Sequence, residues 1–507
     1  MSDLLAADHL PGVERLYTAA ATGAMDRSAI EAGLAGIVLM RRAGAAAFAE
    51  LRARWPDAGA LTVYCGRGNN AGDGYVVAGL AVSRGFEVEL LQLGDPADLS
   101  GDAARARDWA VGEGVRIERF APGRGPRGDV LVDALLGTGL RGAVRPAFAE
   151  AVDTINGAGC PVFAVDVPTG LDADTGAELG TAVRADLTMT FIAAKRGLLT
   201  GRGPALTGAL RFDDLGVPAA LRTGTVAEDP GVALLRLGED DLVLAPRAPD
   251  AHKGAFGHVL VVGGDEGLGG AVLLATEAAL RTGAGLVSCA TRAAHVPALL
   301  ARTPEVMVRA VEHRDALAPL LARATAVVVG PGLGTGPWGE QLLDAVLEAG
   351  RPAVLDADAL NLLAERGPPP AGPPRIVTPH PGEAARLLAT DPATVQGDRF
   401  AAATALARRL GATTVLKGAG TLVATDDAVA LCPLGNPGLA SGGTGDVLAG
   451  ILGALLAQGL DADRAARLGV CLHGAAADRA MAARGVPGLV ASDLSGPLAP
   501  LVDAVSR

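Results

Sequence analysis

Short apolar runs rich in β-branched residues alternate with longer Ala- and Leu-rich segments through both halves of this 507-residue chain. This order predicts an α/β fold in which parallel strands are covered by helices on both faces, giving three αβα layers. The strands predicted in the first half are 61–65, 87–91, 130–134, 161–166 and 186–191. Those predicted in the second half are 258–263, 285–290, 326–329, 353–356, 375–378 and 413–416.

The length of the chain exceeds what one hydrophobic core usually supports, so two domains are expected. The periodic pattern fades between residues 216 and 251 into a passage rich in Pro, Gly and Asp. We place the boundary near residue 222 and expect domains at 1–222 and 223–507. Half of the residues are hydrophobic but only 3% are aromatic, and 70 are glycine, which favours Ala/Val/Leu layers packed closely through small residues.

The net charge and the composition of the chain limit the kinds of partner that it is expected to bind. The formal charge of −12 disfavours a nucleic-acid partner and a surface for anionic membranes, but it allows small anionic ligands where loops supply donors. The five cysteines contain no C-x-x-C pair, which predicts free thiols in a reducing cytosol. Residues 1–17 lack the pattern of a secretory signal, and no run reaches the roughly 18 apolar residues that span a bilayer. We expect a soluble cytoplasmic protein with no membrane partner, and the sequence is compatible with a homo-oligomer.

The segment Asn-Pro-Gly-Leu-Ala-Ser-Gly-Gly-Thr-Gly-Asp at 436–446 runs directly into an apolar helix expected at 447–456. Glycines let the backbone approach a ligand, and a helix start offers N–H groups to an anion. Asp446 stands where a base would face a hydroxyl. A second glycine segment, 416–421, lies shortly upstream. Together they predict a nucleotide phosphate site; the alternative for 436–446 alone is a glycine turn capped by Asp446.

In the first half, polar residues follow the ends of three predicted strands. The segments are Gly-Arg-Gly-Asn-Asn-Ala-Gly-Asp-Gly at 66–74, with a helix expected to start near Tyr75, and the stretches 133–140 and 166–172. Ligands of parallel α/β sheets bind beyond the carboxyl ends of strands, so Asn70, Asp133, Asp166 and Thr169 are expected to converge. Their oxygen atoms suit a hard cation. The alternative is that Asp133 and Asp166 cap the helices that follow.

In order, these three segments resemble NAD(P)H-hydrate epimerase, which interconverts the R and S forms of hydrated nicotinamide dinucleotides. The resemblance implies a Rossmann-like domain and a potassium ion held by Asn70, Asp133 and Thr169. It further implies that the hydrated dinucleotide is held by two loops, with Asp166 beside it as a candidate catalytic residue. The loop residues are Asn69, Asn70, Ala71, Gly72, Asp73, Gly137, Thr138, Gly139, Leu140, Arg141, Gly142 and Ala143.

Two positions depart from that family. Ala71 stands where the family usually has Gly, which is costly if the residue needs a positive φ. Thr169 stands where Ser is frequent but keeps the hydroxyl, so potassium binding is less affected. Lys195 also matches a family feature, and the alternative is a solvated charge after a strand.

The second half resembles ribokinase-like enzymes in its loop at 436–446 and, more specifically, ADP- or ATP-dependent NAD(P)H-hydrate dehydratase. The segments that carry the second resemblance are 253–264, 267–271, 330–334, 356–361 and 378–383. It implies that the C6 hydroxyl of the hydrated ring is phosphorylated and then eliminated, with Asp446 as the catalytic base. It implies ADP as phosphoryl donor and Mg²⁺ as cofactor. The residues implied to contact the hydrated cofactor are Ala271, Gly332, Gly334, His380 and Asp446; those implied for the nucleotide are Lys417, Gly418, Ala419, Gly420, Thr421 and Gly445.

Alternatives remain for both halves. One is a ribokinase-type small-molecule kinase fused to a non-catalytic dinucleotide-binding module. Another is that the first half only binds a protein or senses a nucleotide. His380 could serve only as a turn residue and Glu383 only as a helix-start residue. Asp356, Asp358 and Asn361 stay open between substrate contacts and loop or capping groups.

Overall fold

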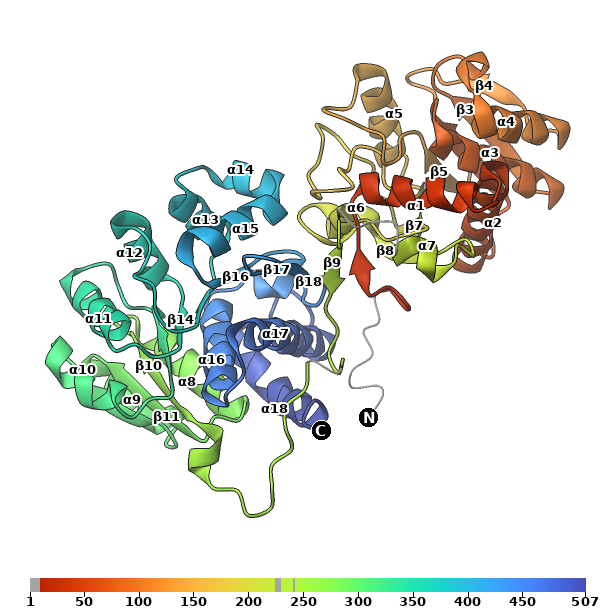
Figure 1. Cartoon of the computed structure of the whole chain (residues 1–507). Helices are drawn as coiled ribbons and strands as arrows, with labels where there is room; N and C mark the ends of the chain where they lie inside the picture. The colour runs from red at the N-terminus through yellow and green to blue at the C-terminus, as the bar shows by residue number, and fades with distance from the viewer. Residues whose placement is uncertain (1–9, 224–228, 240–241) are drawn as a thin grey trace. The chain divides into compact units, whose positions relative to one another are not determined.

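The computed structural model describes residues 10–223, 229–239 and 242–507 (Figure 1). Residues 1–9 lie outside the described residues. They include the start of the segment 1–17, which is expected not to be a secretory signal. Residues 224–228 and 240–241, which belong to the passage 216–251, also lie outside the described residues. The chain forms two compact units, His9–Ala233 and Leu234–Arg507.

The first unit contains a 7-stranded sheet in the order β4-β3-β2-β5-β6-β7-β8, and all of its pairs are parallel. Its strands are β2 (Ala60–Cys65), β3 (Glu87–Gln92), β4 (Ile117–Arg119), β5 (Val130–Ala134), β6 (Val162–Val165), β7 (Leu187–Phe191) and β8 (Ala209–Asp213). An antiparallel pair joins β1 (Arg15–Leu16) to β9 (Val232–Leu234). The helices are α1 (Ala19–Glu31), α2 (Gly36–Arg54), α3 (Asn69–Ser83), α4 (Gly101–Gly112), α5 (Pro146–Gly157), α6 (Gly203–Thr207) and α7 (Ala219–Thr223).

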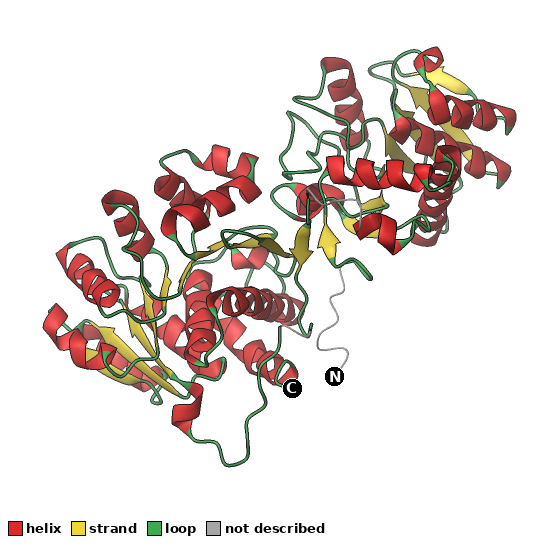
Figure 2. Cartoon of the chain, viewed as in Figure 1, coloured by secondary structure: helices red, strands yellow, loops and turns green. Residues whose placement is uncertain are grey.

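Helices cover both faces of this sheet (Figure 2). Successive side chains of a strand point to opposite faces, and neighbouring residues of β2 accordingly enter different apolar clusters. Val63 packs with residues of α2, α3 and α4, whereas Tyr64 packs with Phe148 and Ile155 of α5. The predicted α/β arrangement of a parallel sheet between two helical layers is confirmed for this unit.

Helix α3 begins at Asn69, so the helix start expected near Tyr75 is wrong. The glycines that favoured a long loop serve close packing within the helix. A Cβ at Gly74 would lie 2.5 Å from the Cβ of Ala134, and one at Gly72 would lie 2.5 Å from the Sδ of Met40. Asn69, Asn70 and Asp73 are therefore held on a helix, which fixes their directions.

The sheet of the second unit runs in the order β18-β17-β16-β15-β14-β13-β10-β11-β12. The pairs from β16 through β12 are parallel, whereas β16, β17 and β18 form an antiparallel extension. The strands are β10 (His258–Val262), β11 (Leu286–Thr291), β12 (Met307–Ala310), β13 (Ala326–Val329), β14 (Ala353–Leu355), β15 (Arg375–Val377), β16 (Thr413–Leu416), β17 (Thr421–Ala424) and β18 (Val429–Cys432). The helices are α8 (Gly269–Arg281), α9 (Val296–Arg302), α10 (Arg314–Leu321), α11 (Pro337–Glu348), α12 (Asp358–Arg366), α13 (Pro381–Leu388), α14 (Pro392–Gly397), α15 (Arg399–Leu410), α16 (Thr444–Ala457), α17 (Ala462–Arg484) and α18 (Ser495–Ala504).

Helix α16 begins at Thr444, ahead of the expected start at Val447. Gly443 has φ 92°, and a Cβ there would lie 2.5 Å from Leu274 Cδ1, so only glycine fits at this entrance. The Thr444 hydroxyl donates to the carbonyls of Leu439 and Ser441, which ties the first helical residue to the loop before it. Asp446 therefore lies within the first turn of α16 and not in the loop.

Two further sequence expectations, on membrane-spanning segments and on cysteine thiols, can be compared with the structure. Among the described residues, every helix is too short or too polar to cross a bilayer. The cysteines are all free thiols, as predicted: Cys65, Cys160, Cys289, Cys432 and Cys471.

Candidate active sites

Asp446 is the centre of the candidate site in the second unit. Burial, together with the nearby carboxylates of Asp356 and Asp358, raises the pKa of its carboxyl to about 7, while Lys417 opposes them. A carboxyl group with a pKa near neutrality can accept a proton and still be substantially ionised at physiological pH. The structure thus gives this residue the properties of a general base.

Lys417 brings three predicted segments together. Its Nζ donates to Asp356 Oδ1 at 2.9 Å and lies 3.8 Å from Glu383 Oε2. The Asp356 carboxylate also accepts a 2.6 Å bond from the Thr378 hydroxyl. A Cβ at Gly445 would lie 3.3 Å from Lys417 Nζ, so the start of α16 directly adjoins this charge cluster.

Side chains from α17 hold the glycine loop in place. Asp478 accepts from the Gly435 N–H and the Asn436 side-chain amide, and His473 Nε2 lies 2.9 Å from the Thr444 carbonyl. Burial lowers the pKa of His473 to about 4, so it is neutral and donates to that carbonyl. The loop is therefore preorganised before any ligand arrives.

The segment 416–421 is a tight connection between β16 and β17, and Thr421 is the first residue of β17. Beneath it lies Arg399, which is fully buried and donates to the carbonyls of Leu416, Lys417 and Gly420. Burial lowers the pKa of its guanidinium to about 10. Sequence reasoning missed Arg399 because it belongs to a helix that carries no motif.

A second turn faces the same site. Asp358 accepts from the Gly334 N–H at 2.8 Å, and a Cβ at Gly332 would lie 3.3 Å from the Cβ of Ala271. Because Asp358 also raises the pKa of Asp446, the turn at 332–334 lies within electrostatic reach of the proposed base. Asp358 is thereby assigned to holding this turn.

His380 is the N-cap of α13. Its Nδ1 accepts from the N–H groups of Gly382 and Glu383, while Glu383 accepts from the His380 N–H. Both residues therefore form a capping box, which is the helix-start alternative considered for Glu383. With Nδ1 occupied as an acceptor, the neutral ring carries its proton on Nε2 and presents a donor. Half of the His380 side chain, 51%, is exposed, so it remains accessible to a ligand.

The first unit has a cavity of about 270 Å³ at the carboxyl ends of its strands. Its walls combine four predicted residues, Asn69, Asp73, Thr138 and Asp166, with Lys195. Asp26 of α1 also lines it and was not predicted from the sequence, since α1 carries no recognisable motif. The cavity thus gathers several carboxyl groups around one ammonium group.

Lys195 is paired with Asp166 inside this cavity. Its Nζ donates to Asp166 Oδ1 at 2.5 Å and also to the Thr190 hydroxyl and the Phe191 carbonyl. Lys195 is only 1% exposed, so the alternative of a solvated charge is wrong. Asp166 has φ 64° and accepts from the Phe191 N–H, so it holds the turn after β6 and does not cap a helix.

The three predicted potassium ligands gather around the loop that follows β5. Asp133 is fully buried and accepts from the N–H and hydroxyl of Thr169 and from the Leu135 N–H. The Thr169 hydroxyl in turn accepts from the Leu136 N–H, and a Cβ at Gly137 would lie 3.7 Å from Asn70 Oδ1. Burial raises the pKa of Asp133 to about 6.

Asn70 is the exception among these groups. Both polar atoms of its side-chain amide are buried and have no hydrogen-bond partner within the protein. Leaving a buried amide unpaired costs about 1–3 kcal/mol, so a ligand at this point would stabilise the fold. An orphaned oxygen beside a buried carboxylate and a hydroxyl fits a hard monovalent cation.

The remaining predicted loop residues differ in position. Ala71 lies inside α3 without a positive φ, so the penalty considered for replacing Gly at this position does not arise. Ala71 and Gly72 are buried in helix packing, whereas Asn69 and Asp73 reach the cavity. In the second loop, Thr138 lines the cavity; the residues beyond it are not among those that line it: Gly139, Leu140, Arg141, Gly142 and Ala143.

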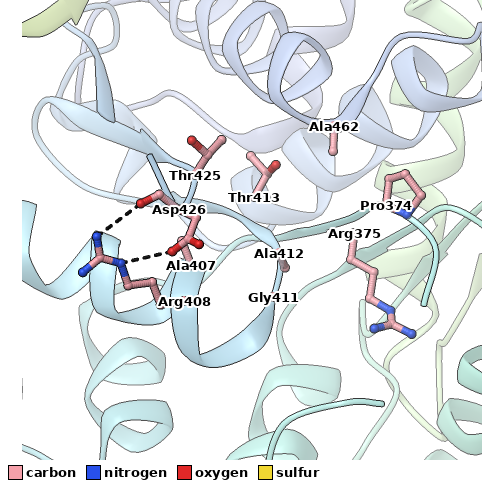
Figure 3. Close-up of a pocket in the computed structure, with 10 residues that line it drawn as sticks. All are labelled: Pro374, Arg375, Ala407, Arg408, Gly411, Ala412, Thr413, Thr425, Asp426 and Ala462. Carbon is pink, nitrogen blue, oxygen red and sulfur yellow. Dashed lines mark hydrogen bonds and ion pairs between the residues drawn. The ribbon is translucent and has the colours of Figure 1, made fainter. Parts of the chain in front are cut away.

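Another hollow, of about 290 Å³, lies at the start of β15 and β16, around Arg375 and Thr413 (Figure 3). Arg408 points toward Asp426 there and forms an ion pair with it. The carboxyl ends of these strands, where the glycine loops gather, are at the opposite edge of the sheet. This hollow therefore does not belong to the candidate site.

Comparison with known proteins matches both units. Residues 36–197 match the family described as YjeF-related protein N-terminus, and residues 259–499 match the family described as NAD(P)H-hydrate dehydratase. The bifunctional NAD(P)H-hydrate repair enzyme of Coxiella burnetii is 48% identical over 480 residues, covering 94% of this chain and 97% of that protein. That of Escherichia coli is 45% identical over 472 residues, covering 93% and 90%. A solved ribokinase-like superfamily protein from Enterococcus faecalis is 30% identical with a TM-score of 0.50, covering 54% of this chain and 96% of its own.

Proposed function

This chain belongs to the family of bifunctional NAD(P)H-hydrate repair enzymes, and on that premise we propose that it restores damaged nicotinamide cofactors in two steps. The first unit, Rossmann-like, interconverts the R and S epimers of hydrated NADH and NADPH and is an isomerase. The second unit, ribokinase-like, dehydrates the S epimer and is a lyase. The substrates are small molecules, and the two activities together return any hydrated epimer to the reduced cofactor.

The position of Asp446 carries the dehydratase assignment. Hydroxide is a poor leaving group, and phosphorylation of the C6 hydroxyl converts it into phosphate. Asp446 takes the proton of that hydroxyl as its oxygen attacks the terminal phosphorus of the nucleotide. Elimination of phosphate together with a ring C5 proton then restores the conjugated dihydropyridine.

The start of α16 supports the phosphoryl group. The first N–H groups of a helix have no partner within the helix, and the helix dipole favours negative charge at this end. The N–H groups of 442–445 are therefore assigned to the transferring phosphoryl group, where charge develops. Lys417 and the turn that follows it are assigned to the nucleotide, next to Gly445.

ADP is the proposed donor, which gives AMP and phosphate as products. This choice follows the resemblance to the family and no single residue of the chain. Mg²⁺ supplies charge neutralisation for the phosphoryl oxygens. Among the described residues, no cluster of three or more His, Cys, Asp or Glu side chains is arranged to hold a metal ion.

Potassium is the proposed ion of the first unit. Asn70, Asp133 and Thr169 would hold it, and the orphaned amide of Asn70 is the observation that supports this. A bound cation would supply positive charge where α3 meets the loop after β5. We assign these three residues to orienting the start of α3 and the loop after β5, which together shape the adjoining cavity.

A ribokinase-type kinase fused to a non-catalytic module is the competing function. The relatives match this chain along almost its whole length and are named as repair enzymes, which favours the repair function over the kinase. The cavity with its Asp166–Lys195 pair supports a catalytic role for the first unit.

The decisive experiment supplies the protein with mixed-epimer hydrated NADH, ADP and Mg²⁺ and follows the absorbance of the reduced nicotinamide. Complete conversion is expected, because epimer exchange feeds the R form to the dehydratase. Conversion that stops when the S form is consumed would contradict the epimerase assignment. Release of a stable phosphorylated product would favour the kinase.

A further inference from the structure

We propose that Asp73 and Asp166 work as an acid–base pair in epimer exchange, with Asp73 donating a proton to one face of the substrate and Asp166 accepting one at the other. This inference rests on the proposed epimerase function and assigns the groups that would move protons in it. Both residues line the same cavity of about 270 Å³ and come from different elements, the first turns of α3 and the loop after β6.

Asp166 is placed as a carboxylate. Its Oδ1 accepts hydrogen bonds from the Lys195 ammonium, the Thr190 hydroxyl and the Phe191 N–H. The carboxylate is thus held in an ion pair with a buried ammonium group. The pair is buried on the lysine side and opens toward the cavity on the aspartate side, since the Asp166 side chain is 17% exposed.

Asp73 is placed as a neutral carboxylic acid. Burial holds its pKa well above the usual range, and the charges of Asp166 and Asp26 raise it further, while Lys195 opposes them. Asp102 of α4 also lines the cavity and adds negative charge. Two carboxyl groups held in different surroundings within one site are the usual basis for separate acid and base roles.

Asp26 is the other candidate for the acid. Burial raises its pKa as well, but the charges that act on it are those of Arg27, Asp102 and Lys195, and Asp166 is not among them. Among the charged groups, Asp166 raises the pKa of Asp73 the most. Asp73 also comes from the strand-end segment 66–74 and shares the cavity wall with Asn69 of the same helix, and we assign it the proton donor role.

The chemical step balances with this pair. Asp73 gives its proton to the C6 hydroxyl, which leaves as water while the lone pair of the ring nitrogen forms the N1–C6 double bond of an iminium ion. Water then adds to C6 from the opposite face, the double-bond electrons return to the nitrogen, and Asp166 accepts the proton released by that water. The pair has exchanged protonation states, and the same steps in reverse convert the other epimer.

The test uses the full-length protein with potassium present and compares Asp73→Asn with wild type. The rate of R-to-S exchange, followed by chromatographic separation of the epimers, is expected to fall about 10² to 10⁴-fold in kcat, with KM changed only a few-fold. Asp73→Glu should recover part of the rate. Asp108→Asn, the same change on the exposed side of α4, is the matched control and should exchange epimers at the wild-type rate. Thermal unfolding of each variant reports on folding, and dehydration of the pure S epimer should stay at the wild-type rate.

Two further measurements separate an acid from a structural residue. The wild-type R-to-S rate should fall on the alkaline side as Asp73 loses its proton, and this limb should vanish in Asp73→Asn. Exchange in water carrying the heavy oxygen isotope should place that isotope on C6 of both epimers. Near-wild-type exchange by Asp73→Asn, an unchanged alkaline limb, or retention of the original oxygen would overturn the proposal. Absence of exchange in the wild type would instead overturn the proposed epimerase function.

Discussion

The ammonium of Lys417 donates a 2.9 Å hydrogen bond to Asp356, a carboxylate that is 1% exposed. Lys417 is thus bonded to a buried partner. It only partly offsets the rise in the pKa of Asp446 that the neighbouring carboxylates cause. Asp446 therefore has a raised pKa although the cation assigned to the nucleotide adjoins the start of α16 at Gly445. Because Lys417 contacts Asp356 and not Asp446, the proposed nucleotide contact and the proposed base remain two separate groups.

Asp446→Asn should abolish dehydration and leave epimer exchange intact. The amide cannot accept the hydroxyl proton, and a base of this kind contributes about 10² to 10⁴-fold in rate. Dehydration of the pure S epimer and R-to-S exchange, measured on the same preparation, test the two halves separately. A mutant that dehydrates at a near-wild-type rate would show that Asp446 is not the base.

The pH dependence of dehydration should follow Asp446. Since its pKa is about 7, kcat/KM for the S epimer should fall as the pH is lowered through neutrality. Lys417 lowers this pKa, so Lys417→Gln should move the acid limb to higher pH in addition to reducing the rate. A pH–rate series for both proteins, with nucleotide saturating, checks the direction. An acid limb that stays in place in the mutant would contradict the coupling.

The same raised pKa predicts a stability effect. A carboxyl group whose pKa is higher in the folded than in the unfolded protein stabilises the fold below its unfolded pKa, and this contribution is lost as the pH rises through about 7. Above neutrality Asp446 is ionised at a cost in stability, and Asp446→Asn removes that cost. Thermal unfolding at pH 8 should therefore show a higher melting temperature for the mutant, and the difference should shrink toward acid pH. A lower melting temperature at pH 8 would contradict the cause given for the shift.

Sequence motifs located the strand-end residues well, because carboxyl ends of neighbouring parallel strands must meet. Asn70, Asp133 and Thr169 belong to separate segments, and the structure brings them to one loop. Residues that act from outside motifs were missed. Arg399 and Asp26 lie on ordinary helices, so only tertiary packing reveals that one supports the turn at 417–420 and the other lines the cavity.

Some of the strands missed by the sequence pattern share a cause. β4 and β12 are short edge strands that contain charged residues, as in Ile117–Arg119 and Met307–Ala310. Edge strands of this kind lack the continuous apolar run of a central parallel strand. β17 and β18 were hidden for another reason: the glycine segment before them was interpreted only as a ligand loop, although it also forms the antiparallel turn after β16.

ADP should support dehydration better than ATP. This prediction follows from family resemblance, since no side chain described above distinguishes two phosphates from three. Initial rates with each nucleotide, at equal concentrations and equal Mg²⁺, measure the preference. A clear preference for ATP would change the donor and leave the proposed reaction intact.

Asn70→Leu should remove the stabilisation by potassium without unfolding the protein. The Asn70 amide is buried and has no hydrogen-bond partner in the protein, so its replacement by an apolar side chain of similar size breaks no internal bond. If the amide oxygen is an ion ligand, wild type should melt at a higher temperature in potassium chloride than in choline chloride, and the mutant should show no difference. Asn156→Leu is the matched control, because Asn156 bonds to Ala182 and Arg184. That control should lose stability equally in both salts while keeping the potassium effect. A potassium effect of wild-type size in Asn70→Leu would exclude Asn70 as a ligand.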